Sequence, residues 1–199
     1  MLKKQDVVVF DFDGTLSAKD AGVEFGKYCF RNSLRPWLFL PLVLMATVAR
    51  KFNLSSIWWR NNINRYQDAD TVKKFAPDFI KQHKMERFGW SADQVAAERA
   101  AGRKVLLISA GPNFLIPELV KDIKFDAVIC TQRDPEKPWR IKSLCWGEHK
   151  VAAMDEWAKK NKIIPNLVRS YSDSKTDLPI MRVASEQVWI NPKTGMRKN

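Results

Sequence analysis

The feature that most constrains the fold is a run of four apolar residues near the start of the chain. Val7–Phe10 (VVVF) is apolar at every position and is followed at once by Asp11 and then by Asp13. A short run without alternation is typical of a strand covered on both faces, as in a parallel sheet. Carboxylates at the end of such a strand need partners, because a buried charge is costly unless it is paired. The run therefore predicts a buried strand that ends at a polar edge of a sheet.

Similar short apolar runs recur along the second half of the chain. They lie at 105–108, ending at Ser109, and at 127–129, 167–168 and 188–190. Helical patterns lie between them. The first is a helix capped by Ser91, running to Ala100 and ended by Gly102, and the others span 114–121 and 148–160. This alternation predicts an α/β domain with a parallel sheet flanked by helices.

Residues 19–90 do not follow this alternation. They hold helical patterns and no convincing strand, with segments expected at 21–30, 36–49, 55–66 and 71–84. We therefore expect residues 1–18 and 91–199 to form the catalytic core, with residues 19–90 inserted into it as an all-helical domain.

The segment RPWLFLPLVLMATVAR at 35–50 has two interpretations. Its uncharged part of about 14 residues would make a helix of roughly 21 Å, too short for a bilayer core of about 30 Å. Arginines bracket the run, and Trp58, Trp59 and Arg60 follow it, which suits a helix lying at a lipid–water interface. The alternative is that the run is the buried core of the helical insertion. The sequence leaves both open.

Composition restricts the partners and the compartment. The formal net charge of +12 on 199 residues favours anionic partners: nucleic acid, an anionic membrane surface or phosphorylated substrates. No nucleic-acid-binding module is recognisable, so we expect no nucleic acid. The three cysteines (Cys29, Cys130 and Cys145) are scattered, and we expect reduced packing residues. With no signal-peptide pattern, we expect a cytoplasmic protein, peripheral on the inner face of the membrane if it contacts lipid.

Polar residues that can carry phosphoryl chemistry follow several of the expected strands. They are Asp11, Asp13, Thr15, Ser109, Ala110, Gly111, Lys150, Asp173 and Asp177. The carboxyl ends of parallel strands meet at one edge, where such folds bind ligands. There, one carboxylate can attack phosphorus while a second transfers protons. Hydroxyls, a lysine and the amides near Gly111, which we place at a helix start, can hold the phosphate oxygens.

The same edge offers ligands for a divalent cation. Asp11, the carbonyl of Asp13 and Asp173 supply hard oxygens, which suit Mg²⁺. Two histidines are too few for a histidine-based site. Asp177 is suited either to hold a metal-bound water or to favour a helix N-terminus. His149, beside Lys150, is expected to be structural.

In order along the chain, DFDGTL, the serine of LLISAG, the lysine of GEHK and the acidic pair of YSDSKTDLP resemble the four motifs of the haloacid dehalogenase superfamily. An aspartate two residues after the nucleophile is characteristic of its phosphatases. The resemblance implies a Rossmann-like core with a helical cap after the first strand, as in the branch that includes phosphoserine phosphatase. It also implies roles: Asp11 as nucleophile, Asp13 as general acid and base, Ser109 and Lys150 as phosphate ligands, Asp173 as metal ligand.

The substrate depends on the cap. Asp20 lies where the phosphoserine phosphatase branch places an acidic substrate residue, and it is equally suited to cap a helix. The apolar cap segment and the segment WRIKSLCWGEHKVAAM are more similar to the bacterial phosphatidylglycerophosphatase C group. We therefore expect a lipid phosphate such as phosphatidylglycerol phosphate. The alternatives are a soluble phosphatase for phosphoserine or another small metabolite, and a catalytically idle binding module.

Overall fold

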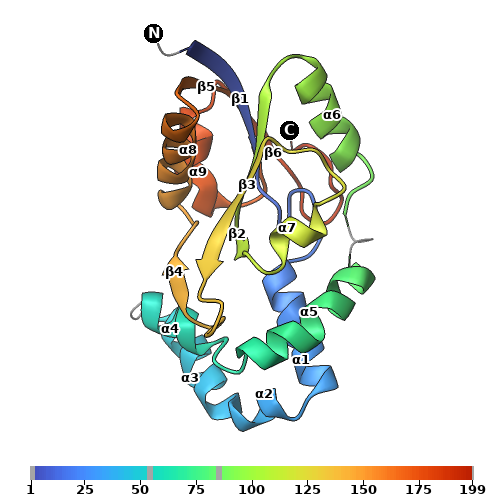
Figure 1. Ribbon diagram of the computed structural model, residues 1–199, viewed down its shortest axis with the longest axis vertical. Coiled ribbons are helices and arrows are strands. Elements are labelled where there is room, and N and C mark those ends of the chain that lie inside the picture. Colours follow the sequence, from blue (N-terminus) through green and yellow to red (C-terminus); the bar gives the residue numbers. More distant parts are fainter. Residues whose placement is uncertain (1–2, 53–55, 84–86, 199) are drawn as a thin grey trace.

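The computed structural model describes residues 3–52, 56–83 and 87–198 (Figure 1). A six-stranded sheet with strand order β4-β3-β2-β1-β5-β6 forms its centre. Neighbouring strands are parallel except β3 and β4. The strands are β1 (Lys3–Phe10), β2 (Lys104–Pro112), β3 (Ala127–Arg133), β4 (Ile141–Ser143), β5 (Ile163–Ser172) and β6 (Glu186–Trp189). The predicted α/β class with a parallel sheet is confirmed.

Helices cover both faces of the sheet, which explains why the second half of β1, Val7–Phe10, is apolar at every position. Val8 and Phe10 pack into one core, towards α6 (Ser91–Ala100) and α7 (Ile116–Leu119). Val7 and Val9 pack into a second core, towards α8 (His149–Lys160) and α9 (Leu178–Val183). Figure 1 shows the two helix pairs on opposite sides of the strands. Successive side chains of a strand point to opposite faces, and here each face is buried.

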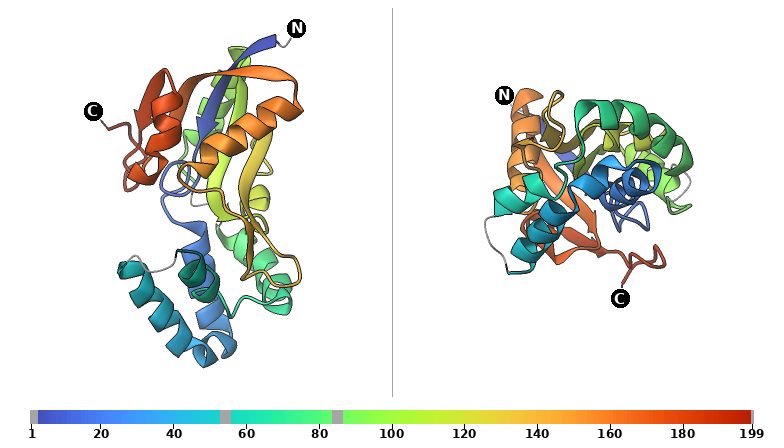
Figure 2. Two further views of the ribbon diagram at one scale, coloured as in Figure 1. Left: turned by 90° about the vertical axis from the view of Figure 1, so that its left-hand side faces the viewer. Right: turned by 90° about the horizontal axis from the view of Figure 1, so that it is seen from below.

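The helices that follow β1 and precede α6 gather beyond the carboxyl ends of the strands (Figures 1 and 2). They are α1 (Ala21–Asn32), α2 (Arg35–Leu38), α3 (Leu40–Lys51), α4 (Ser56–Asn62) and α5 (Ala69–His83). Helix α1 packs on α5 through aromatic rings, with Phe25 and Phe79 centroids 5.3 Å apart. We call α1–α5 the cap. Its treatment as a separate domain, with boundaries at 18/19 and 90/91, stays a prediction.

Prolines explain two differences from the expected helices. The run at 36–49 is broken at Phe39 into α2 and α3, which places Pro41 in the first turn of α3, where a proline is favoured. Likewise, the helix expected at 114–121 contracts to α7, whose first turn contains Pro117. In the helices expected at 55–66 and 71–84, Ser55 and Lys84 lie outside the described residues.

Two further predictions were wrong in detail. Ser91 does not cap α6: it is the first helical residue, and its hydroxyl donates to the carbonyl of Leu16 at 3.1 Å. The second strand does not end at Ser109 but continues to Pro112 after a register shift against β3. The short antiparallel strand β4 was not predicted.

The apolar run at 35–50 is only partly buried, so the interpretation as simple cap core is incomplete. Ala46 and Ala49 of α3 are buried, whereas Leu44, Met45 and Val48 are 57%, 54% and 54% exposed. We define the apolar cap face as seven large residues of α2, α3 and the adjoining turns, each more than half exposed: Leu34, Trp37, Leu38, Leu44, Met45, Val48 and Phe52. No helix among the described residues is long and apolar enough to cross a membrane.

Candidate active site

A tight loop after β1 carries the first two candidate carboxylates. The amide of Asp11 donates to the carbonyl of Tyr171 at 3.0 Å, which extends the pairing of β1 with β5. The carbonyl of Phe12 then accepts hydrogen bonds from the amides of Thr15, Leu16 and Ser17 at 2.9–3.2 Å. The chain can turn this sharply because Gly14 adopts a φ of +75°. The loop places Asp11 at the carboxyl edge of the sheet.

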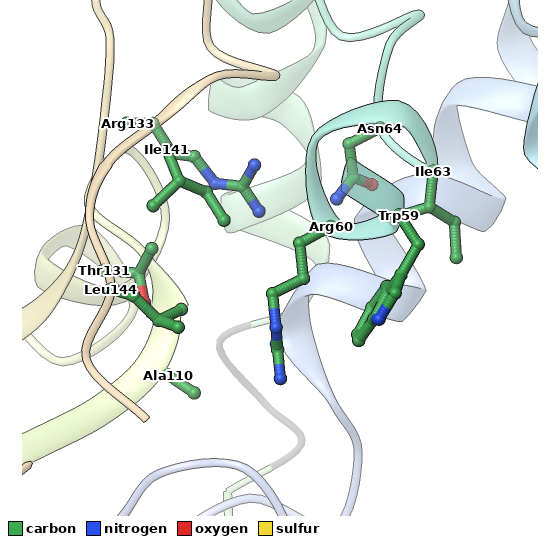
Figure 3. A pocket seen from close by; sticks show the side chains of 9 residues that line it. All are labelled: Trp59, Arg60, Ile63, Asn64, Ala110, Thr131, Arg133, Ile141 and Leu144. Carbon is green, nitrogen blue, oxygen red and sulfur yellow. The ribbon is translucent and has the colours of Figure 1, made fainter. Parts of the chain in front are cut away.

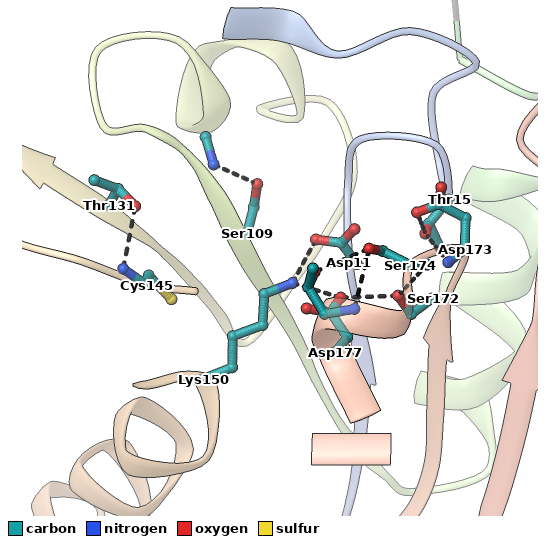
Figure 4. A network of polar contacts seen from close by, with 12 residues as sticks. Asp11, Thr15, Ser109, Thr131, Cys145, Lys150, Ser172, Asp173, Ser174 and Asp177 are labelled. Atoms are coloured by element: carbon teal, nitrogen blue, oxygen red, sulfur yellow. Dashed lines mark hydrogen bonds and ion pairs between the residues drawn. The ribbon is translucent and has the colours of Figure 1, made fainter. Parts of the chain in front are cut away.

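Lys150 lies at the centre of the site (Figure 4). It is 2% exposed, and its Nζ lies 2.7 Å from Asp11 Oδ1 and 2.7 Å from Asp177 Oδ2. Asp177 also accepts a hydrogen bond from the Ser172 hydroxyl at 2.8 Å. The ammonium is therefore fixed between two carboxylates that come from different segments. The sequence identified all three residues but did not predict that Asp177 pairs with Lys150.

Asp173 follows β5 and packs directly on the loop. Its amide donates to Thr15 Oγ1 at 3.0 Å, and that hydroxyl donates to Asp173 Oδ1 at 3.4 Å. A Cβ on Gly14 would lie 2.4 Å from Asp173 Oδ2, so only glycine leaves room for this carboxylate. Thr15, expected to bind phosphate, orders Asp173 here. The loop thus brings Asp173 to the same edge as Asp11.

Asp13 and Asp20 both lie at the start of the cap. Asp13 Oδ1 accepts a hydrogen bond from the Ala21 amide at 2.7 Å, and Asp20 Oδ1 accepts one from the Val23 amide at 2.8 Å. Asp20 is the N-cap of α1, one of the two roles that the sequence left open. The contact of Asp13 joins the loop after β1 to the first cap helix.

Ser109 is fully buried in β2, and its hydroxyl accepts a hydrogen bond from the Gly111 amide at 3.0 Å. The expectation that Gly111 lies at a helix start was wrong. It belongs to β2, and α7 begins only at Ile116, with four residues. Ala110 lies between the two and lines a pocket described below.

Burial and charge shift the pKa values of these groups. Burial raises the pKa of Asp11 to about 6; the Lys150 ammonium opposes the shift, while the charge of Asp177 adds to it. Burial, together with the charges of Asp20 and Asp11, raises the pKa of Asp13 well above its ordinary value. Burial alone would lower the pKa of Lys150, but the two carboxylates outweigh it and raise the pKa. The site therefore combines a lysine cation that two carboxylates stabilise with two buried carboxyl groups whose pKa values are raised, that of Asp13 well above its ordinary value.

The sequence profile of the haloacid dehalogenase-like hydrolases matches residues 8–182, a span that includes the whole constellation around Lys150. The chain belongs to this family. A probable phosphatase of Mycobacterium tuberculosis (strain ATCC 25618 / H37Rv) is 25% identical over 203 residues, covering 95% of this chain and 70% of that protein. The histidinol-phosphatase of Neisseria meningitidis serogroup C (strain 8013) is 24% identical over 218 residues, covering 98% of this chain and 94% of that protein.

A solved structure described as a phospho-aspartyl intermediate analogue of phosphoserine phosphatase has the same fold, with a TM-score of 0.66 and 16% sequence identity. It covers 94% of this chain and 87% of the other. The family match and the phosphatase relatives identify the chain as a phosphatase, against the interpretation as an idle binding module.

The donor set at this edge suits a hard cation. Among the described residues, no group of three or more His, Cys, Asp or Glu side chains is arranged to hold a metal ion. Mg²⁺, however, is usually held by one or two carboxylates together with water and other oxygens. Asp11 and Asp173 follow the neighbouring strands β1 and β5, and burial, with the charge of Asp177, raises the pKa of Asp173, so a cation beside it would stabilise its ionised form. These two carboxylates are of the kind that could hold such an ion, and the Asp13 carbonyl stays a ligand proposed from the sequence.

His149 is exposed at the start of α8, and the structural role expected of it stays a prediction. The three cysteines are buried and free, and burial raises the pKa of each thiol, to about 12 for Cys29, 11 for Cys130 and 12 for Cys145. Such thiols are inert, as expected for packing residues.

Sequence reasoning missed a pair of arginines that face each other across the boundary between cap and core. The sequence left open whether Arg60, with Trp58 and Trp59, faces lipid. In the structure Arg60 is half-buried and lines a pocket with Arg133 of β3 (Figure 3). The only hint in the sequence was the pair Trp59-Arg60, since tryptophan often stacks on arginine, but the pair does not indicate whether these side chains face lipid or the core.

Proposed function

We propose that the chain hydrolyses phosphomonoesters through a phosphorylated Asp11. An Asp11 oxygen attacks phosphorus and forms a P–O bond, while the bond from phosphorus to the alcohol oxygen breaks. Asp13 donates its proton to that oxygen, which leaves as the alcohol. Asp13 then accepts a proton from water, whose oxygen attacks phosphorus and releases Asp11 and phosphate. The observation that carries the proposal is the buried Lys150 ammonium, held 2.7 Å from both Asp11 and Asp177.

The other site residues position the phosphoryl group. Lys150 and Ser109 would hold its oxygens, and Asp177 would keep the lysine side chain aligned. Asp11, the carbonyl of Asp13 and Asp173 would hold Mg²⁺. When bound, Mg²⁺ neutralises the charge that develops on phosphoryl oxygens. Thr15 acts through Asp173, whose carboxylate it orients.

A lipid phosphate is the substrate that the cap surface favours. The apolar cap face lies at the end of the molecule farthest from the sheet (Figure 1) and exposes large side chains of two successive helices. Exposed basic residues, Arg31, Arg50 and Lys51, lie beside it. Large apolar side chains exposed together on successive helices are typical of an interaction site, and nearby cations add about 1 kcal/mol each at an anionic leaflet. A membrane containing anionic lipid satisfies both features.

Two measurements test the lipid proposal. The first is Mg²⁺-dependent phosphate release from phosphatidylglycerol phosphate in mixed micelles, compared with phosphoserine, with Asp11→Asn as the inactive control. The second is flotation with anionic vesicles at low salt, comparing the wild type with Leu44→Glu and with Val183→Glu. Val183 is similarly exposed but lies on α9, which packs beside the sheet and not in the cap. We expect lipid preference, and vesicle binding that is lost only in Leu44→Glu.

A soluble phosphatase for a small metabolite is the second candidate. The names of the matched relatives, histidinol-phosphatase and phosphoserine phosphatase, favour it. Preference for phosphoserine or histidinol phosphate, with the wild type remaining unbound to vesicles, would select this candidate and contradict the lipid proposal. Asp11 would remain the nucleophile in either case.

A further inference from the structure

A pocket of about 320 Å³, counting its open mouth, lies where the cap meets the core (Figure 3). Its lining residues come from both sides: Trp59, Arg60, Ile63 and Asn64 from the cap, and Ala110, Thr131, Arg133, Ile141 and Leu144 from the core. Ala110 directly follows Ser109, the candidate phosphate ligand of β2. The pocket therefore lies one residue along β2 from the proposed phosphate ligand.

The pocket is positively charged without a counter-charge. Its lining includes Arg60 and Arg133 but no acidic residue. Neither arginine forms an ion pair with any residue within 3–52, 56–83 or 87–198, and the Nε atoms of both are buried without a hydrogen-bond partner there. Arg133 does donate through Nη1 to the Trp139 carbonyl at 2.9 Å. Buried donors are normally satisfied, so these two are available for a ligand.

Aromatic rings hold Arg60 in an orientation suited to binding an anion. Its guanidinium lies 4.4 Å from the ring centroid of Trp59 and 4.5 Å from that of Trp146. Rings contact the face of a guanidinium, whereas its N–H donors point outward in its plane. The contacts therefore fix the side chain and leave its hydrogen-bonding edge available. Figure 3 shows Arg133 and Arg60 reaching into the space between cap and core.

The charges of the pocket repel one another. Burial, together with the positive charge of Arg60, lowers the pKa of Arg133 to about 10. Burial and the charge of Arg50 lower the pKa of Arg60. An anion bound between the two guanidiniums would relieve this repulsion and satisfy the buried donors at the same time.

We propose that Arg60 and Arg133 bind a second anionic group of the substrate, a phosphodiester joined by a short linker to the phosphomonoester in the catalytic site. This rests on the proposed phosphatase function and narrows its substrates to compounds with both groups. An amino acid would bring an ammonium as well as a carboxylate, and the pocket lining has no acidic residue to pair with that ammonium. Ile63, Ile141 and Leu144 offer apolar contacts for the carbon linker, and Thr131 and Asn64 neutral hydrogen bonds.

Soluble probes separate this pocket from any effect of a membrane. The substrate is deacylated phosphatidylglycerol phosphate, which carries a phosphodiester and a phosphomonoester, and the reference is glycerol 3-phosphate, which lacks the diester. The readout is the ratio of kcat/KM for the two. Arg133→Gln and Arg60→Gln are compared with Arg140→Gln, a matched loss of charge outside the pocket. Thermal melts establish that each variant is folded, and Arg133→Lys replaces Arg133→Gln if the latter is not.

We expect the wild type to prefer the diester-containing probe, and each pocket variant to lower the ratio about ten- to a hundredfold through KM, the usual effect of losing a charged hydrogen bond. Arg140→Gln should keep the wild-type ratio. A wild-type ratio near one, or a ratio unchanged in both pocket variants, would overturn the proposal. A third outcome would also overturn it: the preference for phosphoserine over ethanolamine phosphate depends on Arg60 and Arg133, while the preference for the diester-containing probe does not. The pocket would then bind a carboxylate.

Calorimetric binding of the deacylated lipid phosphate in EDTA distinguishes failure of the pocket from failure of the proposed function. Binding that Arg133→Gln weakens, without hydrolysis of any probe when Mg²⁺ is added, would support the pocket and contradict the phosphatase mechanism. Hydrolysis together with binding that does not change in the Arg60 and Arg133 variants would support the phosphatase mechanism and contradict the pocket proposal.

Discussion

Gly14→Ala is expected to damage the site in two separable ways. At φ +75° an alanine is strained, at a cost of about 1–2 kcal/mol. Its Cβ would also lie 2.4 Å from Asp173 Oδ2, and since real Cβ contacts are not shorter than 3.0 Å, the carboxylate must retreat by at least 0.6 Å. A displacement of about 1 Å at a catalytic group costs on the order of a hundredfold in rate. We therefore expect kcat/KM to fall about ten- to a hundredfold.

Two other glycines provide matched controls. Gly102 has a φ of +77°, and a Cβ added there would meet no atom within 4 Å, so Gly102→Ala carries the backbone strain alone. Gly89 has neither strain nor a close neighbour. Urea unfolding should show similar losses of stability for Gly14→Ala and Gly102→Ala, and none for Gly89→Ala. Mg²⁺-dependent hydrolysis of p-nitrophenyl phosphate should fall only in Gly14→Ala. Equal activity of Gly14→Ala and Gly102→Ala would refute the reasoning.

Three further predictions concern charge. Lys150→Met leaves Asp11 and Asp177 buried without their cation, so it should cost about 3–5 kcal/mol in urea unfolding and abolish turnover; unchanged stability would contradict the ion-pair geometry. Glu98 is 1% exposed. Burial alone would raise the pKa of its carboxyl group, but hydrogen bonds from Arg103, Tyr171 and Arg169 outweigh burial and lower that pKa. Its stabilisation is therefore present above about pH 4.5 and lost as the pH falls, so acid melts of Glu98→Gln should depend less on pH than those of the wild type. EDTA should stop phosphate release and Mg²⁺ restore it, and activity that persists in EDTA would argue against the oxygen ligand set.

The sequence was sufficient to place the candidate carboxylates at one edge of the sheet, because the topology of the strands brings them together; their catalytic roles stay a proposal. Asp11 and Asp173 follow strands apolar enough to be buried, and parallel strands end at the same edge. The ion pair of Lys150 with Asp177 was less accessible, since it depends on the turn of the 3-10 helix η2 (Lys175–Asp177). The helix starts at α3 and α7 agree with the preference of Pro41 and Pro117 for a first helical turn, but a proline alone does not fix a break, because Pro77 lies inside α5.

The approach of Arg60 to Arg133 was beyond sequence reasoning. The two residues are 73 positions apart, and their proximity depends on how the cap packs on the core. That packing uses specific contacts, such as the Ile141 amide donating to Asn61 Oδ1 at 3.0 Å and Arg65 stacking on Trp139 at 3.6 Å. Periodicity reports which residues are apolar, but not which surfaces of two separate units meet.

The central claim is that Asp11 carries the phosphoryl group during turnover. The most direct test is to quench the enzyme with acid during hydrolysis of a radiolabelled phosphomonoester and to map the labelled peptide. We predict label that is stable to acid, released by hydroxylamine and located on Asp11, and no label in Asp11→Asn. Label on another residue, or turnover without any label while Asp11→Asn remains active, would contradict the mechanism.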